Sequence, residues 1–276
     1  MASGRVTDYD SVADRYDVRY GRYGYSGVRD TVLSFLGDAT AVLEVGCGTG
    51  HWLAEIGARL KPSPYEDRAD AGSAKGSAER QWLAGIDPSM QMLERARRAA
   101  PAAQLVRARA EALPWRDQAF DRVFCVNALH HFADRERFFA EARRVLRPGG
   151  GLLTIGKDPH REGDSWWVYD YFEETCAIDR VRYAPVKTLR GEIARAGFAW
   201  AESLEADHIE IMVPAAAALA EGADGVVTPT FTSQLTVLSE EEFARGVERI
   251  READAAGGGT LQLVADFKLY ATIGWL

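Results

Sequence analysis

Three glycines at alternate positions are the clearest chemical feature of the sequence. Gly46, Gly48 and Gly50 directly follow the apolar run 41–45 and precede a segment with helical periodicity. Glycine lets the backbone turn sharply and lets a ligand approach without a Cβ in the way. The spacing differs from the Gly-x-Gly-x-x-Gly of dinucleotide-binding folds, and no Lys-Ser or Lys-Thr pair follows it as in a phosphate-binding loop. The loop therefore predicts a ligand site of another kind, and a tight turn without a ligand is the alternative.

An acidic residue, Asp87, ends the next apolar run, 82–86. At the end of a second strand, a carboxylate can accept hydrogen bonds from both ribose hydroxyls of a nucleoside. Asp87 lies farther from the glycines than is usual, and the polar residues 61–80, which are typical of a surface insertion, account for the difference. The alternative is that Asp87 caps the helix whose first turn contains Pro88.

Strands and helices alternate over residues 41–156, and this alternation positions the loop and the acid. The predicted strands are the apolar runs 41–45, 82–86, 104–107, 120–126 and 152–155. Amphipathic segments between them are predicted helices, so the strands must form a parallel sheet with helices on its faces. Further predicted elements are a helix at 26–36, a helix at 187–197, a strand near 208–212, a charged helix at 239–254 and a long strand at 260–273.

The composition is that of an ordinary globular protein, with 276 residues, 47% of them apolar and 27% charged. A net charge of −8 makes nucleic acids and anionic membranes poor partners, so a small molecule is the expected partner. No apolar run approaches the roughly 20 residues of a membrane span, and the first residues lack a hydrophobic signal core. The scattered Cys47, Cys125 and Cys176 favour free thiols in a reducing cytoplasm. No metal site is predicted, and an oligomer is left open.

Several ordered segments resemble the motifs of class I S-adenosylmethionine-dependent methyltransferases, in the small-molecule, ubiquinone-methyltransferase-like subgroup. The segments are Val42–Trp52, Gly85–Leu93, Arg109–Pro114, Phe120–Val123, Asn127–His131 and Arg144–Gly151. The resemblance implies an α/β, Rossmann-like, seven-stranded and mostly parallel sheet with helices on both faces. Its strand order would be 3-2-1-4-5-7-6, with strand seven antiparallel. The implied activity is in-line methyl transfer from S-adenosylmethionine to a natural product or other apolar metabolite, which leaves S-adenosylhomocysteine.

The resemblance also implies roles in cofactor binding for the residues that match these motifs. Glu44 would support the glycine loop, Asp87 would hold the ribose, and Asn127 would lie near the methionine part. The other expected cofactor-binding residues are Gly46, Cys47 and Gly48 beside the methionine part, Ser89 and Met90 flanking the adenine with Pro88 next to them, and Ala110 and Glu111 at the adenine edge. Arg109 departs from the acidic residue that many relatives carry there, so adenine recognition is expected from backbone groups near Ala110 and Glu111.

The loops after strands four and five are expected to face the transferred methyl group. Ligands in open α/β sheets lie beyond the carboxyl ends of the strands. His130 and His131 follow strand four and His160 follows strand five, and each is a candidate catalytic base because histidine titrates near neutrality. For the first two, packing and helix capping are the alternative.

Aromatic residues are the candidate acceptor contacts. Trp166, Trp167 and Tyr169 would form an apolar or cation-binding wall, unless they are core residues of an accessory helix. Tyr16 and Tyr20 resemble the lid segment of the subgroup, which often closes over the cofactor, and a surface helix is the alternative.

The expected organisation is an N-terminal helical lid over residues 1–37 and a methyltransferase domain over residues 38–276. The domain would carry the surface insertion at 61–80 and a substrate cap around 157–186 and 214–255. Two other functions stay open: a non-transferase that binds S-adenosylmethionine, such as a cyclase or sensor, and a protein methyltransferase. A nicotinamide dehydrogenase is the least supported class.

Overall fold

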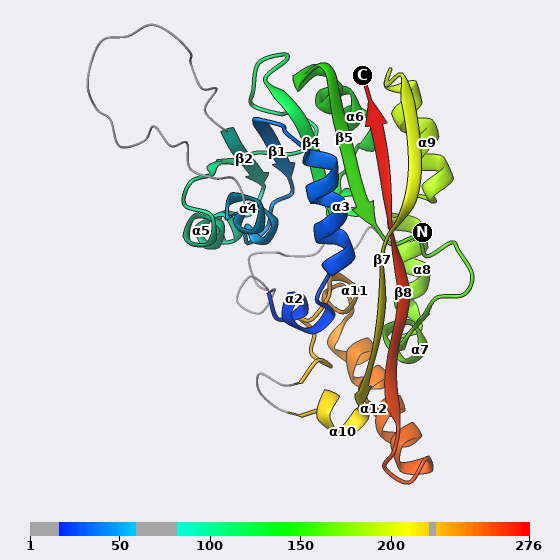
Figure 1. Ribbon diagram of the computed structural model, residues 1–276. Coiled ribbons are helices and arrows are strands. Elements are labelled where there is room, and N and C mark those ends of the chain that lie inside the picture. The colour runs from blue at the N-terminus through cyan, green and yellow to red at the C-terminus, as the bar shows by residue number, and fades with distance from the viewer. Residues whose placement is uncertain (1–16, 59–81, 221–224) are drawn as a thin grey trace, which may run out of the picture.

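One mixed β-sheet is the framework of the computed structural model, which describes residues 17–58, 82–220 and 225–276 (Figure 1). Its strands are β1 (Ala41–Val45), β2 (Trp82–Asp87), β3 (Gln104–Arg107), β4 (Phe120–Val126), β5 (Leu146–Gly156), β6 (Ser165–Trp166), β7 (Trp200–Pro214) and β8 (Gln262–Trp275). The order is β3-β2-β1-β4-β5-β8, and β6 and β7 each pair with β8. β1 to β5 are parallel, and β8 is antiparallel to its neighbours. With β7 and β8 counted as strands six and seven, the expected order is confirmed; the short β6 was not expected.

Helices cover both faces of the sheet, as the alternation of elements predicted (Figure 1). They are α2 (Val18–Tyr23), α3 (Ser26–Leu36), α4 (His51–Gly57), α5 (Met90–Ala99), η1 (Leu129–His131), α6 (Arg135–Val145), α7 (Trp167–Tyr171), α8 (Glu174–Arg182), α9 (Val186–Arg195), α10 (Ala215–Ala218), α11 (Ser233–Thr236) and α12 (Glu240–Ala256). α12 begins with a capping box, in which Ser239 and Glu242 each accept a hydrogen bond from the other's backbone N–H.

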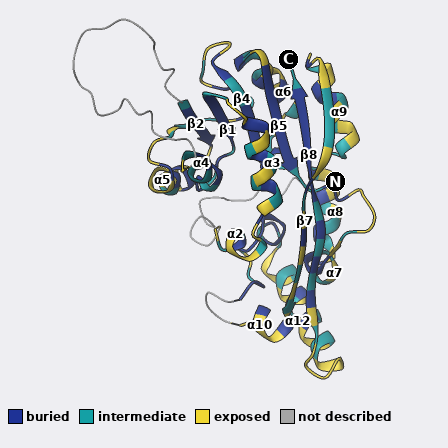
Figure 2. Ribbon diagram, in the orientation of Figure 1, coloured by how far each residue is buried: buried dark blue, intermediate teal, exposed yellow. Residues whose placement is uncertain are grey.

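Two hydrophobic cores lie on opposite faces of the sheet. The side chains of α3 and α4 pack with Phe124 of β4 and Leu153 of β5 in one core. The side chains of α6 and α9 pack with Val123 and Leu152 in the other. Successive side chains of a strand point to opposite faces, so a strand covered on both sides is apolar at every position. This burial explains why the central strands are continuous apolar runs in the sequence (Figure 2).

Two strands extend beyond their predicted bounds. β5 begins at Leu146 rather than Leu152, and its pairing with β4 shifts register between Phe120 and Arg122, so a Pro-Gly-Gly run is taken into the strand. β7 begins at Trp200, well before the predicted 208–212. The expected insertion at 61–80 lies outside the described residues, as do residues 1–16 of the expected lid.

The β7–β8 ribbon continues past the parallel strands and carries a second group of helices (Figure 1). β5 pairs only with residues 270–275 of β8, whereas residues 262–269 pair with β7 and, at two positions, with β6. α7 and α10 contact β8 in this part, and α12 packs against both helices. The expected substrate cap falls on these helices. None of the described helices is both long and apolar enough to cross a membrane.

Replacing Gly246 by alanine should destabilise this second group of helices. An added Cβ would lie 2.2 Å from Cδ1 of the buried Phe172 ring. Overpacking of this kind costs about 1–3 kcal/mol, measurable as a lower urea midpoint. Gly191→Ala is the matched control, since its Cβ would meet only the Arg195 side chain at 3.4 Å in α9. That change should be neutral or stabilising by up to about 1 kcal/mol. Equal stability of the two variants would contradict the packing described.

Candidate active site

The glycine loop is held open by hydrogen bonds to the end of the neighbouring strand. The backbone N–H groups of Gly46 and Cys47 both donate to the carbonyl oxygen of Ile86, at 2.9 and 2.8 Å. Gly46, Gly48 and Gly50 have φ values of +75°, +52° and +82°, in the region that favours glycine. The loop therefore keeps a shape that residues with side chains would strain.

Neighbouring atoms of the protein lie so close to two of these positions that only glycine fits there. A Cβ on Gly46 would lie 2.6 Å from Cβ of Ala128, just after β4. A Cβ on Gly50 would lie 2.9 Å from Cα of Ala96 in α5. The loop is thus packed directly against the chain that leaves β4 and against α5.

Asp87 links the glycine loop to the start of α5. Its Oδ2 accepts a hydrogen bond from the N–H of Gly48 at 3.0 Å, and its Oδ1 accepts one from the N–H of Ser89 at 2.9 Å. The cap of α5 is Ser89, whose Oγ accepts from the N–H of Met92. The helix-capping alternative for Asp87 therefore applies to Ser89 instead.

Burial favours the uncharged form of two ionisable groups in the floor of the loop. Burial raises the pKa of Glu44 well above its ordinary value, with the nearby Asp87 charge adding to the effect. Oε2 of Glu44 is buried without a hydrogen-bond partner among the described residues. Burial likewise raises the pKa of the Cys47 thiol. Burial therefore disfavours negative charge in the floor of the loop, and Asp87 is the acidic group at its side.

The remaining expected cofactor residues lie near the end of β2 or in the loop after β3. Met90 begins α5 and is partly exposed, and the carbonyl of Pro88 accepts from Arg107 Nε. Ala110 is buried, whereas Glu111 Oε1 accepts from the N–H of Ala133 at 2.7 Å. The Glu111 side chain thus ties the loop after β3 to the loop before α6.

The segment around α2 covers the glycine loop. The Thr49 hydroxyl donates a hydrogen bond to Oδ1 of Asp17. The Tyr20 ring stacks on the His51 ring, with centroids 3.8 Å apart, and packs edge-on against Trp52 at 5.9 Å. α2 therefore closes one side of the site. Tyr16, the other tyrosine expected in the lid, lies outside the described residues.

A cavity with about 420 Å³ of empty space, part of it open to solvent, lies beyond the carboxyl ends of β4 and β5. It is lined by Arg19, Tyr23, Tyr25, Asn127, His130, His131, Lys157, Trp166, Tyr183, Thr232, Ser233, Gln234, Phe267 and Leu269. Asn127 follows β4 directly, with φ +50°, and its N–H donates to the Ile155 carbonyl at 2.8 Å. Because Asn127 precedes Ala128, which Gly46 contacts, the cavity adjoins the glycine loop.

The expected histidines take different positions. His130 and His131 both line the cavity, and burial lowers the pKa of His130 well below its ordinary value and that of His131 to about 3. Both rings are therefore neutral near pH 7. Nε2 of His130 lies 3.0 Å from the Tyr183 hydroxyl. His160 is not among the described lining residues, and its Nε2 lies 2.9 Å from the Tyr183 carbonyl oxygen, to which the ring donates.

The expected aromatic wall is divided between the cavity and the core. Trp166 lines the cavity. Trp167 is buried and packs near Phe172 and Phe231, with centroids 6.1 and 6.2 Å away. Tyr169 donates its hydroxyl to Oδ2 of the buried Asp179 at 2.6 Å. The structure thus brings Trp166 to the cavity and places Trp167 and Tyr169 behind it.

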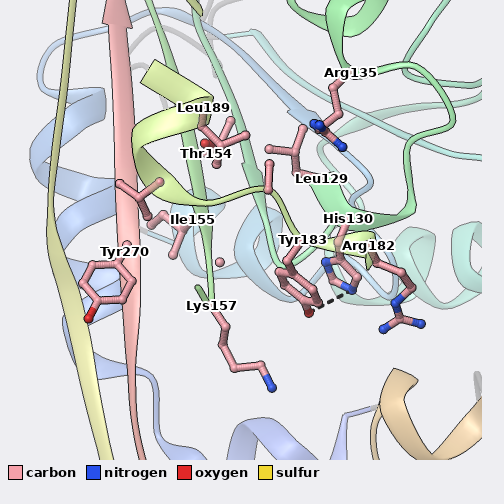
Figure 3. Close-up of a pocket in the computed structure, with 13 residues that line it drawn as sticks. Leu129, His130, Arg135, Thr154, Ile155, Lys157, Arg182, Tyr183, Leu189 and Tyr270 are labelled. Carbon is pink, nitrogen blue, oxygen red and sulfur yellow. Dashed lines mark hydrogen bonds between the residues drawn. The ribbon is translucent and has the colours of Figure 1, made fainter. Parts of the chain in front are cut away.

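A second cavity, with about 400 Å³ of empty space that is partly open to solvent, lies on the α9 side of Tyr183 (Figure 3). His130, Lys157 and Tyr183 line both cavities, so these side chains form the partition between them. Figure 3 shows the hydrogen bond between His130 and Tyr183, and shows the Lys157 side chain extending from the end of β5 away from Thr154.

Sequence reasoning missed several cavity residues. Lys157 could have been found, because it directly follows β5. Ligands in open α/β sheets lie beyond the carboxyl ends of the strands, and this applies to Lys157 as it does to the histidines. Tyr183 and Gln234 carry no such signal, since α8 and α11 bring them to the cavity from segments outside the alternating strand–helix pattern.

Comparison with known proteins places this geometry in a family. A family profile described as "Methyltransferase domain" matches residues 69–154. The ubiquinone/menaquinone biosynthesis C-methyltransferase of Acidiphilium cryptum is 37% identical in an alignment 178 positions long, which covers 53% of this chain and 72% of that protein. The chain belongs to the class I S-adenosylmethionine-dependent methyltransferases.

Other relatives match over a smaller share of their own length or resemble the chain in fold alone. The phthiotriol/phenolphthiotriol dimycocerosates methyltransferase 1 of Mycobacterium ulcerans is 34% identical over 156 residues, 56% of this chain and 49% of that protein. The chain thus matches about half the length of this relative. A putative methyltransferase from an antibiotic biosynthesis pathway of Anabaena variabilis shares the fold, with a TM-score of 0.59 at 17% identity over 89% of this chain and 96% of that one.

Acid should destabilise the protein through His131. Its pKa is lowered to about 3, so between that value and about 6.5 the unfolded chain binds more protons than the folded protein. The free energy of unfolding should therefore fall by about 2 kcal/mol between pH 6.5 and pH 5 on account of this residue. Urea unfolding of His131→Gln should show a smaller fall.

His208→Gln is the control for this measurement. A hydrogen bond to Asp266 raises the pKa of the exposed His208. Replacing His208 should therefore leave the fall in the free energy of unfolding at low pH in place. An unchanged pH dependence in His131→Gln would contradict a buried neutral ring.

Proposed function

We propose that the protein transfers a methyl group from S-adenosylmethionine to a small, largely apolar acceptor by in-line displacement. The observation that carries the proposal is the contact between the two halves of the site. The glycine loop touches Ala128, and the neighbouring Asn127 lines the cavity, so a methyl donor on the loop would face an acceptor in the cavity. In-line transfer needs such positioning more than it needs reactive side chains.

The loop residues fit the family's cofactor. When bound, S-adenosylmethionine supplies an electrophilic methyl group on a sulfonium. The positive φ values of Gly46, Gly48 and Gly50 give the loop a shape that residues with side chains would strain, and the Asp87 carboxylate beside it is a group that can accept hydrogen bonds from ribose hydroxyls. We propose that Gly46, Cys47 and Gly48 lie beside the methionine part and Asp87 beside the ribose.

The cavity walls support an apolar acceptor. Tyr23, Tyr25, Trp166, Phe267 and Leu269 contribute aromatic and aliphatic surface. Relatives named for phthiotriol dimycocerosates and for ubiquinone and menaquinone biosynthesis also indicate lipophilic small molecules. The net charge of −8 argues against nucleic acid, and three free cysteines support a reducing cytoplasm. His130 and His131, as neutral rings, are suited to orienting the acceptor by hydrogen bonds.

Calorimetry with S-adenosylhomocysteine tests the cofactor half of this proposal. Asp87→Ala should weaken binding by about 1.5–3 kcal/mol, roughly 10- to 150-fold, because a hydrogen-bonded charged acceptor is lost. Glu94→Ala, which removes an exposed carboxylate on α5, should bind like the unmodified protein.

Two outcomes would count against the assignment in different ways. Unchanged affinity in Asp87→Ala would remove this carboxylate from the cofactor site. No binding by the unmodified protein, or no S-adenosylhomocysteine formed with a panel of hydroxylated aromatic acceptors, would overturn the proposed function.

A further inference from the structure

Lys157 has a buried ammonium group that the described protein does not satisfy. The residue directly follows β5, and its side chain is 10% exposed. Nζ has no hydrogen-bond partner among the described residues and lies 3.3 Å from the centroid of the Trp166 ring. An ammonium has three donors, and burying them without acceptors is costly. A ligand oxygen in the adjoining cavity would supply the missing acceptor.

Asp179 does not fill this need. Its Oδ2 lies 3.9 Å from Nζ of Lys157, too far for a hydrogen bond. The Asp179 carboxylate already accepts from the Tyr169 hydroxyl at 2.6 Å, Gln234 Nε2 at 2.8 Å and Arg182 Nη2 at 2.9 Å. Donors that lie closer than Lys157 therefore use the acceptor sites of the Asp179 carboxylate.

The charge of the cavity wall favours a ligand with an acidic group. Among its described lining residues, Arg19 and Lys157 are basic and none is a carboxylate. This balance is opposite to that of the whole chain, which carries a net charge of −8. Electrostatic complementarity of this kind selects an anionic or ionisable oxygen.

We propose that Lys157 is a catalytic residue that binds an acidic hydroxyl of the acceptor, phenolic or enolic, and takes its proton. This inference rests on the proposed function. The O–H bond breaks, an N–H bond forms at Nζ, and the electron pair stays on the oxygen, which the new ammonium holds. That oxygen, or a carbon conjugated with it, then bonds to the methyl carbon as the carbon–sulfur bond breaks and the thioether leaves.

The surroundings of Lys157 keep its amine available near neutral pH. Burial lowers its pKa to about 7, while Asp179 acts in the opposite direction. A base with a pKa near the working pH is the most effective. The titratable and charged groups that face Lys157 are Asp179, Arg182 and Cys176 of α8, Asp164 before β6, Tyr169 of α7, Arg19 of α2, and His130, His131 and Tyr183 across the cavity.

The test uses 4-nitrophenol, whose phenolate absorbs visible light, and its neutral methyl ether 4-nitroanisole. Protein with and without saturating S-adenosylhomocysteine should bind 4-nitrophenolate at least about tenfold more tightly than 4-nitroanisole. The absorbance should show the pKa of bound 4-nitrophenol lowered by roughly one unit or more. Lys157→Met should lose both effects and keep its affinity for 4-nitroanisole.

Controls separate this role from a structural one. Lys268→Met removes an exposed lysine on β8 that pairs with Glu205, and it should keep the phenolate preference. Lys157→Met should unfold at the same or a higher temperature, because a buried unsatisfied charge is removed. A lower unfolding temperature, or an unchanged phenolate preference in Lys157→Met, would overturn the proposal.

Failure of the proposed function would look different. In that case S-adenosylhomocysteine would not bind, and the cofactor-free protein would still prefer 4-nitrophenolate in a Lys157-dependent way. Equal binding of both probes by the unmodified protein, with S-adenosylhomocysteine bound normally, would overturn only the role of Lys157.

Discussion

The site depends on the hydrogen bonds that tie the glycine loop to the end of β2. Three consecutive N–H groups, those of Gly46, Cys47 and Gly48, donate to two consecutive residues, through the Ile86 carbonyl and the Asp87 carboxylate. These bonds satisfy the backbone of a loop that no helix or strand could satisfy. They form only because β1 and β2 are parallel neighbours whose carboxyl ends meet at the same edge. A register change between these strands would separate the acid from the loop.

A buried carboxylate has the corresponding role on the acceptor side. Asp179 of α8 accepts hydrogen bonds from Tyr169 of α7 and Gln234 of α11, so it joins three helices behind the cavity. Arg182, one turn further along α8, balances its charge. Buried hydrogen-bond networks stiffen their surroundings, because breaking a bond leaves an unpaired group in a poorly solvated place. This network positions Tyr183 and Gln234 in the cavity, and it leaves Nζ of Lys157 without a hydrogen-bond partner among the described residues.

The sequence predicted the elements where local pattern and burial agree. The central strands are buried on both faces, so the sequence shows them as apolar runs. The helices predicted at 26–36 and 239–254 correspond to α3 and α12. β7 was predicted too short because its first half carries Glu202, Glu205 and Asp207, and polar residues on an outer strand weaken the apolar signal. The start of β5 was missed because Pro and Gly normally end structure, whereas here they form an irregularity within a strand.

The matched family profile covers the cofactor side of the site and the cavity to different extents. The matched family profile spans residues 69–154 and contains Asp87 and Asn127. The glycine loop precedes it, and Lys157, Trp166, Gln234 and Phe267 all follow it. Those residues are positioned by the β7–β8 ribbon and its helices, which extend past the parallel strands (Figure 1). The sheet edge proposed to hold the methyl donor contacts few residues of the ribbon, so substitutions in the ribbon would change the acceptor preference without disturbing the glycine loop. The choice of acceptor is therefore to be sought in the part of the chain after β5, where sequence motifs are weakest.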